Sequence, residues 1–339
     1  MTSPEPDPRA PYPDLRGAFM LTVLAMLAAA FTGVAFIDFG LLAAVGIGQA
    51  IGVGAVATMG AQRVAEPQAE RLGLRALDWK MVPAILCLTP AILLASELDN
   101  IAADWSGATA VVETSSGDEG AAVQENGFDD SVVDADSTEQ AIESATDALD
   151  EGSDSGIDLD SPLIDPSDPL SLLSAFIVMV GISPVVEEFL FRGVIQQGLV
   201  QRMGMLRGIT MVALLWTLLR PAPIAGVSRF LAAAAASFAL GCALGLVRVA
   251  TRSILGSIVL ASSWAAIGLT AISLEGRLPL PGMNVEGTHL PWSVTIACLA
   301  LVGWAGREIY LEAGKAFELD RTSMQKSMQK PRDARESDT

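Results

Sequence analysis

The stretch LSLLSAFIVMVGISPVVEEFLFRGVIQQGL, residues 170–199, places two adjacent glutamates and an arginine at the end of a long apolar run. A helix needs roughly 20 residues to cross a hydrocarbon core of about 30 Å, and this run is of that order. A charged side chain near the bilayer centre costs about 2.5–3.5 kcal/mol even on insertion scales. The charges at Glu187, Glu188 and Arg192 therefore mark a candidate functional site.

Similar apolar runs recur along the chain, which has 339 residues, 51% of them hydrophobic, and a mean hydropathy of +0.45. Length alone would allow two or three soluble domains, but several runs are long enough to span a bilayer. We therefore expect an all-α integral membrane protein with about eight transmembrane helices, the fifth of them short. The expected helices are Gly17–Ile37, Gly40–Ala61, Met81–Leu98, Leu170–Phe191, Gly208–Leu219, Phe230–Val247, Ile254–Leu274 and Trp292–Tyr310.

The net charge of −18 is a local property of one segment. Of the 39 acidic residues, 21 lie between Glu97 and Asp168, a stretch without Lys or Arg, so the remaining 18 acids face all 21 bases. A segment of this composition, with few aromatic residues, is typical of a disordered polyelectrolyte. The overall acidity therefore indicates no partner by itself, and nucleic acid is not an expected partner.

The basic residues of the N-terminal tail, of the loops after the second, fourth and sixth expected helices and of the tail after Tyr310 all fall on one side of the membrane if the chain crosses it eight times. Because basic flanks face the cytosol, we expect a multi-pass protein of the inner (cytoplasmic) membrane with both termini cytosolic. The expected segments are a disordered cytosolic tail (1–16), three transmembrane helices (17–98), an acidic disordered extracytoplasmic loop (99–169), a core with the paired glutamates (170–274), an outer loop with the last helix (275–310) and a basic cytosolic tail (311–339).

Small residues repeat at four-residue spacing in two expected helices, as Gly48 and Gly52 in the second and as Gly241 and Gly245 in the sixth. Small side chains at this spacing let two helices approach closely in lipid. The pattern predicts close packing and carries no chemistry.

On a helix, Glu188 and Arg192 are four residues apart and share a face, so they can form an ion pair. Glu187 lies about 100° around the helix and is left to act on another group. A carboxylate in a low-dielectric site is suited to take a proton from water. Gly181 and Pro184, one turn earlier, are expected to loosen the helix where the site begins. The alternative is an interfacial charge cluster that only ends the helix.

The wider string EEFLFRG, residues 187–193, followed by Gln196, resembles the first motif (EExxxR, commonly EExxFRG) of the CPBP family. These are the CAAX-protease and bacteriocin-processing membrane proteins, also called Abi proteins. The resemblance covers about residues 170–274. It implies a helical bundle around a hydrophilic cavity and glutamate-dependent intramembrane endopeptidase activity, typically after a prenylated cysteine in eukaryotes. By this resemblance, Glu187 would activate water, and Glu188 and Arg192 would support the site.

The second and third motifs of that family, FxxxH and HxxxN or HxxxD, are not matched. In ALLWTLLRPA, residues 213–222, Trp216 stands for the aromatic residue and Arg220 for the histidine. In RSILGSIVLASSWAA, residues 252–266, Ala261 stands for the histidine and Ala265 for the Asn or Asp. A slip in the alignment by one or two residues brings in a serine but no imidazole.

These replacements remove the chemistry of imidazole. Arginine cannot accept a proton as neutral imidazole can and does not ligate metals, and alanine offers neither donor nor ligand. We therefore expect no metal and no cofactor. The chain's single histidine, His289, lies on the predicted outer side, where a solvated side chain is expected rather than a ligand.

Three functions remain open from the sequence. The first is a degenerate member of the CAAX-protease-like family that binds a membrane-embedded or lipidated peptide or scaffolds a partner. The second is an active protease in which Glu187 is the base and Arg220 donates to an oxyanion, although a cation beside Glu187 would weaken it as a base. Arg220 beside Glu187 or Glu188 is more naturally a second ion pair between helices, which would preserve the fold after the chemistry was lost. The third, an unrelated transporter or structural membrane protein, is disfavoured because no internal repeat is found. Membrane lipids are expected partners in each case.

Overall fold

The computed structural model describes residues 11–106, 164–220, 227–285 and 287–336, with side chains up to Thr322. Within these ranges the chain forms helices and loops, and no β-strand is present apart from one isolated bridge between Pro281 and Val285. The predicted all-α class is confirmed.

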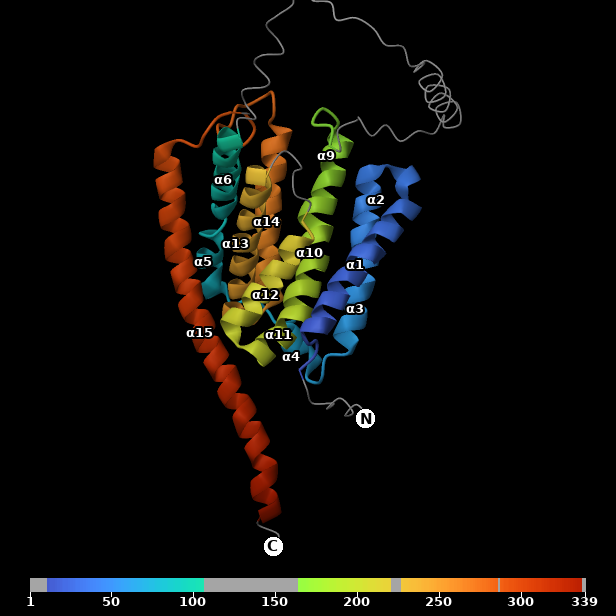
Figure 1. The fold of residues 1–339 in the computed structure, drawn as a ribbon, viewed down its shortest axis with the longest axis vertical. Helices are drawn as coiled ribbons and strands as arrows, with labels where there is room; N and C mark the ends of the chain where they lie inside the picture. Colours follow the sequence, from blue (N-terminus) through green and yellow to red (C-terminus); the bar gives the residue numbers. More distant parts are fainter. Residues whose placement is uncertain (1–10, 107–163, 221–226, 286, 337–339) are drawn as a thin grey trace, which may run out of the picture. The chain divides into compact units, whose positions relative to one another are not determined.

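The first described range forms a helical hairpin followed by a loop and a broken helix (Figure 1). Its elements are α1 (Leu15–Ala35), the 3₁₀ turn η1 (Ile37–Phe39), a continuous helix made of α2 (Leu41–Ile47), the π-helical η2 (Gly48–Val53) and α3 (Gly54–Gln62), then α4 (Gln68–Leu72), η3 (Trp79–Met81), α5 (Val82–Leu86) and α6 (Ala91–Ser106).

The later ranges begin with a long continuous helix that carries the paired glutamates. It consists of α9 (Pro169–Ala175), the π-helical η4 (Phe176–Ile182), α10 (Ser183–Glu188), the π-helical η5 (Phe189–Ile195) and α11 (Gln196–Met203). Asp168 caps its start by accepting hydrogen bonds from the N–H groups of Leu170 and Ser171. The remaining helices are α12 (Met205–Leu218), α13 (Val227–Thr251), α14 (Ile254–Ser273) and α15 (Trp292–Glu336).

Seven helical segments of the described chain are long and apolar enough to cross a membrane, and each corresponds to one of the expected spans. The segments are Leu15–Ala35, Leu41–Gln62, Trp79–Trp105, Pro169–Met203, Val227–Thr251, Ile254–Ser273 and Trp292–Thr322. The expected fifth span is the shorter apolar helix α12. The chain is therefore a multi-pass membrane protein, and the eighth crossing remains a prediction.

Helix α13 is the central packing element, because α6, α12, α14 and α15 all contact it. The hairpin of α1 and α2–η2–α3 packs through η2 and α3 against α10 and η5. Helix α14 contacts η4, α10 and η5. This arrangement surrounds the glutamate-bearing helix with α12, α13 and α14 on one side and the N-terminal hairpin on the other.

Several helices are longer than the sequence predicts; the helix that carries the paired glutamates, for instance, continues to Met203 and does not end at Phe191. The third expected span ends at Leu98, but α6 continues to Ser106 because its polar residues are paired: Asp99 with Arg229 (2.7 Å) and Asp104 with His289 (2.8 Å). The last helix continues to Glu336 instead of ending at Tyr310. Most of the acidic segment predicted for residues 99–169 lies outside the described residues.

The predicted loosening of the helix before the site takes the form of a π-helical segment. Segment η4 contains Gly181 and ends just before Ser183 and Pro184. Proline has no N–H to donate, so the hydrogen-bond ladder is interrupted there. A second π-helical segment, η5, begins directly after Glu188, and such segments recur at functional sites.

The predicted close packing at small residues is present. A Cβ built on Gly52 would lie 2.5 Å from the backbone nitrogen of Ala29, and one on Gly48 would lie 2.6 Å from the carbonyl oxygen of Ala29. Gly241 is also close-packed, since its Cβ would lie 3.1 Å from that of Ala213 in α12.

We expect Gly52→Ala to destabilise the protein by about 1–3 kcal/mol, because the added methyl group meets the backbone of α1, which cannot move away cheaply. Thermal unfolding of the purified protein in detergent measures the effect. Gly268→Ala in α14 is the matched control, since a Cβ there meets no atom within 4 Å, and it should leave the melting temperature unchanged or higher. Equal melting temperatures for the two variants would contradict this packing.

Candidate functional site

The candidate site is a cluster of five side chains from two neighbouring parts of the bundle. Glu187 and Glu188 end α10, and Arg192 lies in η5. Trp216 lies near the end of α12, and Arg220 follows that helix. We refer to these five residues as the glutamate cluster.

A buried ion pair forms the inner half of the glutamate cluster. Arg192 Nη1 lies 2.8 Å from Glu188 Oε1, and the two side chains are 0% and 1% exposed. The pairing expected from their spacing is therefore present. Arg192 Nη2 also donates to the carbonyl oxygen of Gly241 in α13 (3.2 Å).

The same contact is repeated one turn further along the helix. Gln196 Nε2 donates to the carbonyl oxygen of Gly245 (2.8 Å). Gln196 lies four residues after Arg192, and Gly245 lies four residues after Gly241. Donors four residues apart on one helix therefore meet acceptors four residues apart on another. The glycines that the sequence marks for close packing also expose the carbonyl groups that hold these two side chains.

The outer half of the glutamate cluster fixes Glu187. Its Oε2 accepts hydrogen bonds from Arg220 Nη2 (2.8 Å) and from Trp216 Nε1 (3.2 Å). The Glu187 side chain is 17% exposed and that of Arg220 is 43% exposed, so this ion pair lies nearer to solvent than the inner one. Glu187 is thus paired with Arg220, the residue that the sequence alignment places at the histidine position of the second motif.

Trp216 joins the two halves through its indole ring. The guanidinium carbon of Arg192 lies 5.1 Å from a ring centroid of Trp216, and that of Arg220 lies 4.2 Å from it. Cation–π contacts of this kind contribute about 0.5–1 kcal/mol at exposed sites and more when they are desolvated. Both arginines of the glutamate cluster are held by an aromatic face as well as by a carboxylate.

Some hydrogen-bonding capacity in the glutamate cluster and in the adjacent Gln196 is not used. Glu188 Oε2, Arg192 Nε and Gln196 Oε1 are buried and have no hydrogen-bond partner in the described part of the protein. Ser257 of α14 faces Glu188 and is fully buried, but its hydroxyl donates to the carbonyl oxygen of Ile254 (2.9 Å). Sequence reasoning missed Ser257, although it lies four residues before Ala261 and hence on the same face of α14.

The other expected motif positions bring no acid–base group to the site. Ala261 packs against the hydrophobic core, and the hydroxyl of Ser263 donates to Val259 in its own helix. Among the described residues, no group of three or more His, Cys, Asp or Glu side chains is placed to hold a metal ion.

Comparison with known families assigns the segment around the glutamate cluster. Residues 169–267 match the model of the family described as type II CAAX prenyl endopeptidase Rce1-like. The predicted resemblance to the CAAX-protease family is confirmed over this segment. The matched CAAX-endopeptidase-like segment runs from the first residue of α9 into α14 and contains the whole glutamate cluster. No curated protein and no solved structure matches the chain.

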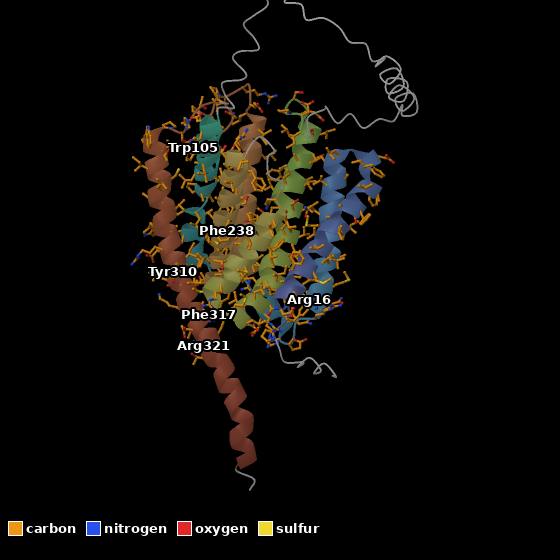
Figure 2. All side chains as sticks on the ribbon, viewed as in Figure 1. Arg16, Trp105, Phe238, Tyr310, Phe317 and Arg321 are labelled. Carbon is orange, nitrogen blue, oxygen red and sulfur yellow. The ribbon has the colours of Figure 1, made fainter. Side chains whose placement is uncertain are left out.

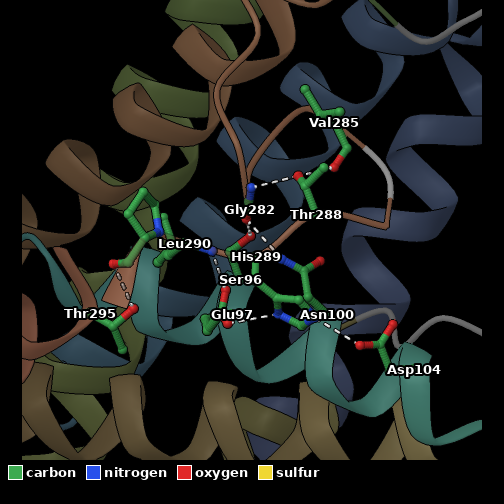
Figure 3. A network of polar contacts seen from close by, with 11 residues as sticks. Ser96, Glu97, Asn100, Asp104, Gly282, Val285, Thr288, His289, Leu290 and Thr295 are labelled. Atoms are coloured by element: carbon green, nitrogen blue, oxygen red, sulfur yellow. Dashed lines mark hydrogen bonds and ion pairs between the residues drawn. The ribbon is translucent and has the colours of Figure 1, made fainter. Parts of the chain in front are cut away.

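His289 lies outside the glutamate cluster, in the loop before α15, and its imidazole contacts two carboxylates of α6 (Figure 3). Its Nδ1 lies 2.8 Å from Glu97 Oε1 and its Nε2 lies 2.8 Å from Asp104 Oδ2, both in α6. Glu97 Oε2 also accepts from the N–H of Leu290 (2.8 Å). The His289 side chain is 41% exposed, as expected for a solvated loop residue, and in addition its two contacts fasten the loop to α6.

The hydrogen bonds to Asp104 and then to Glu97 raise the pKa of His289 above its ordinary value of 6.5. A raised pKa in the folded state means that the protonated form stabilises the loop. This contribution is complete below about pH 6.5 and is lost as the pH rises through the folded-state pKa. Because the chain has one histidine, NMR of protein labelled at histidine follows a single imidazole. We expect Asp104→Asn to lower its pKa, and an equal pKa in both proteins would contradict the contact.

Proposed function

We propose that this chain is a CAAX-protease-like membrane protein in which the paired glutamates stabilise the bundle and do not activate water, so that it acts as a binding or scaffold protein. The observation that carries the proposal is the position of Glu187. Its Oε2 is occupied by two donors, Arg220 and Trp216, of which Arg220 stands where the family has a histidine.

The rest of the expected machinery supports the same proposal. Activation of water needs a group that accepts a proton and a neighbouring donor that orients the substrate or stabilises the oxyanion. Ala261 can do neither, and Arg220 is permanently protonated and already paired. The glutamate cluster then serves to fix α10, η5, α12 and α13 relative to one another.

The ligand that we propose is a membrane-embedded or lipidated peptide, taken up by the helical bundle that the family uses for such substrates. We further propose the inner membrane as the location, with both termini cytosolic. In support, the start of α1 and the far end of α15 lie at one end of the bundle, and the ends of α6 and α9 that border residues 107–163 lie at the other (Figure 1).

The alternative function is an active glutamate-dependent intramembrane protease. One observation favours it: the Glu187 side chain is partly exposed, and its Oε1 has no hydrogen-bond partner in the described part of the chain. This oxygen could take a proton from water while Arg220 donates to an oxyanion. The two functions differ in whether peptide bonds are cut.

Peptide-terminus profiling of membranes from cells that express wild-type protein or Glu187→Gln at equal levels distinguishes them. The proposal predicts the same set of termini in both, because Glu187 has a structural role. Glu275→Gln, which neutralises an exposed carboxylate in the loop after α14, is the matched control for expression and insertion. Termini found with wild type and with Glu275→Gln, but not with Glu187→Gln, would contradict the proposal and establish the protease.

The double variant Arg220→His with Ala261→His provides a second arm of this experiment. It returns imidazoles to the two positions where the family has histidines. New termini that depend on both substitutions and on Glu187 would show that the bundle retains the family geometry and has lost only the chemistry.

A further inference from the structure

A cavity of about 720 Å³ is lined by residues of α4, α11, the end of α13 and the middle of α15. Helices α4 and α11 lie at the lower end of the bundle in Figure 1. It is separate from the outer half of the glutamate cluster, although Arg192 and Gln196 reach its wall. Its lining is strongly basic. Two acidic residues, Glu70 and Asp320, face six arginines: Arg71, Arg75, Arg192, Arg248, Arg252 and Arg321.

Half of these arginines are neutralised by carboxylates. Arg75 pairs with Glu70 (2.8 Å), Arg252 pairs with Asp320 (2.8 Å), and Arg192 pairs with Glu188 outside the cavity lining. The other three, Arg71, Arg248 and Arg321, take part in no ion pair within the described ranges. The cavity therefore has a surplus of positive charge.

Arg248 is the most buried of these three arginines without an ion pair. It is only 8% exposed and lies across Gly73, whose missing side chain makes room for the guanidinium group: a Cβ there would lie 2.3 Å from its central carbon. Its Nη2 donates to the carbonyl oxygen of Arg71 (3.0 Å), but its buried Nε–H has no partner in the described chain. Asp320 attracts Arg248 but is in ion-pair contact with Arg252, so Arg248 has no carboxylate of its own. A buried cation of this kind is costly unless an anion shares its site.

The position and the remaining lining indicate which anion fits. The cavity lies at the last turns of two candidate membrane spans, Pro169–Met203 and Val227–Thr251, where lipid headgroups are expected. Val200, Val249 and Phe317 form an apolar part of its wall. Figure 2 shows Phe317 and Arg321 on the same stretch of α15, at the end of the bundle that also carries Arg16.

We propose that this cavity binds the phosphate group of an anionic phospholipid, with Arg71, Arg248 and Arg321 as its ligands and the acyl chains along the apolar wall. Guanidinium groups match phosphate oxygens with paired N–H donors, and basic pockets between transmembrane helices are suited to such headgroups. The proposal goes beyond the proposed function, since it needs no peptide substrate and no catalysis.

Thermal unfolding of the purified full-length protein in a neutral detergent tests the site, with added phosphatidylglycerol, phosphatidylcholine of the same chains, or inorganic phosphate. We expect phosphatidylglycerol to raise the melting temperature in a saturable manner and phosphatidylcholine to have at most half the effect. The variant Arg71→Gln with Arg321→Gln should lose at least half of the phosphatidylglycerol shift. It should also fold, because Arg248 is bound to the backbone of Arg71 and not to its side chain.

The matched control is Arg63→Gln with Arg207→Gln, which removes two exposed arginines that do not line the cavity. It should keep the full shift. If both double variants lose the phosphatidylglycerol shift equally, the lipid is attracted diffusely and not by this cavity. If phosphatidylglycerol and phosphatidylcholine raise the melting temperature equally, the protein does not select the lipid by its charge. A full shift with inorganic phosphate alone would make the ligand a soluble anion. Each of these three results would overturn the proposal.

Discussion

The ion pair between Glu188 and Arg192 is the constraint on which the rest of the described bundle depends. Both side chains are essentially inaccessible to solvent, and taking two charges out of water is favourable only if their geometry and remaining hydrogen bonds are good. Arg192 therefore needs the carbonyl group of Gly241 and the ring of Trp216 as well as its carboxylate. These contacts fix η5 against α12 and α13, the helix against which four others pack.

The same pair explains why Glu187 lies where it does. Because Glu188 faces inward, the adjacent Glu187 is turned about 100° toward α12, where Trp216 and Arg220 meet it. A histidine at the position of Arg220 would offer a neutral nitrogen, whereas arginine brings a permanent charge that pairs with the carboxylate.

Local features of this chain could be predicted from its sequence, and most long-range ones could not. The Glu188–Arg192 pair follows from their spacing on one helix, and the close packing at Gly48, Gly52 and Gly241 follows from residue size. The ion pair of Arg220 with Glu187 could be predicted only because the family resemblance places Arg220 at the second motif, whereas the bond of Trp216 to Glu187 depends on how α10 and α12 pack. Likewise, α6 extends to Ser106 because partners far along the chain, Arg229 and His289, meet its acids.

The measurement that tests the central claim most directly is a double-mutant cycle on unfolding free energy, with Glu187→Gln, Arg220→Gln and both together. If Glu187 is a structural residue, each single variant destabilises the protein and the two are coupled by about 0.5–1 kcal/mol, a modest value because Arg220 is 43% exposed. No coupling, with Glu187→Gln neutral or more stable than wild type, would contradict the account, since a carboxylate retained for activity is commonly held at a cost in stability.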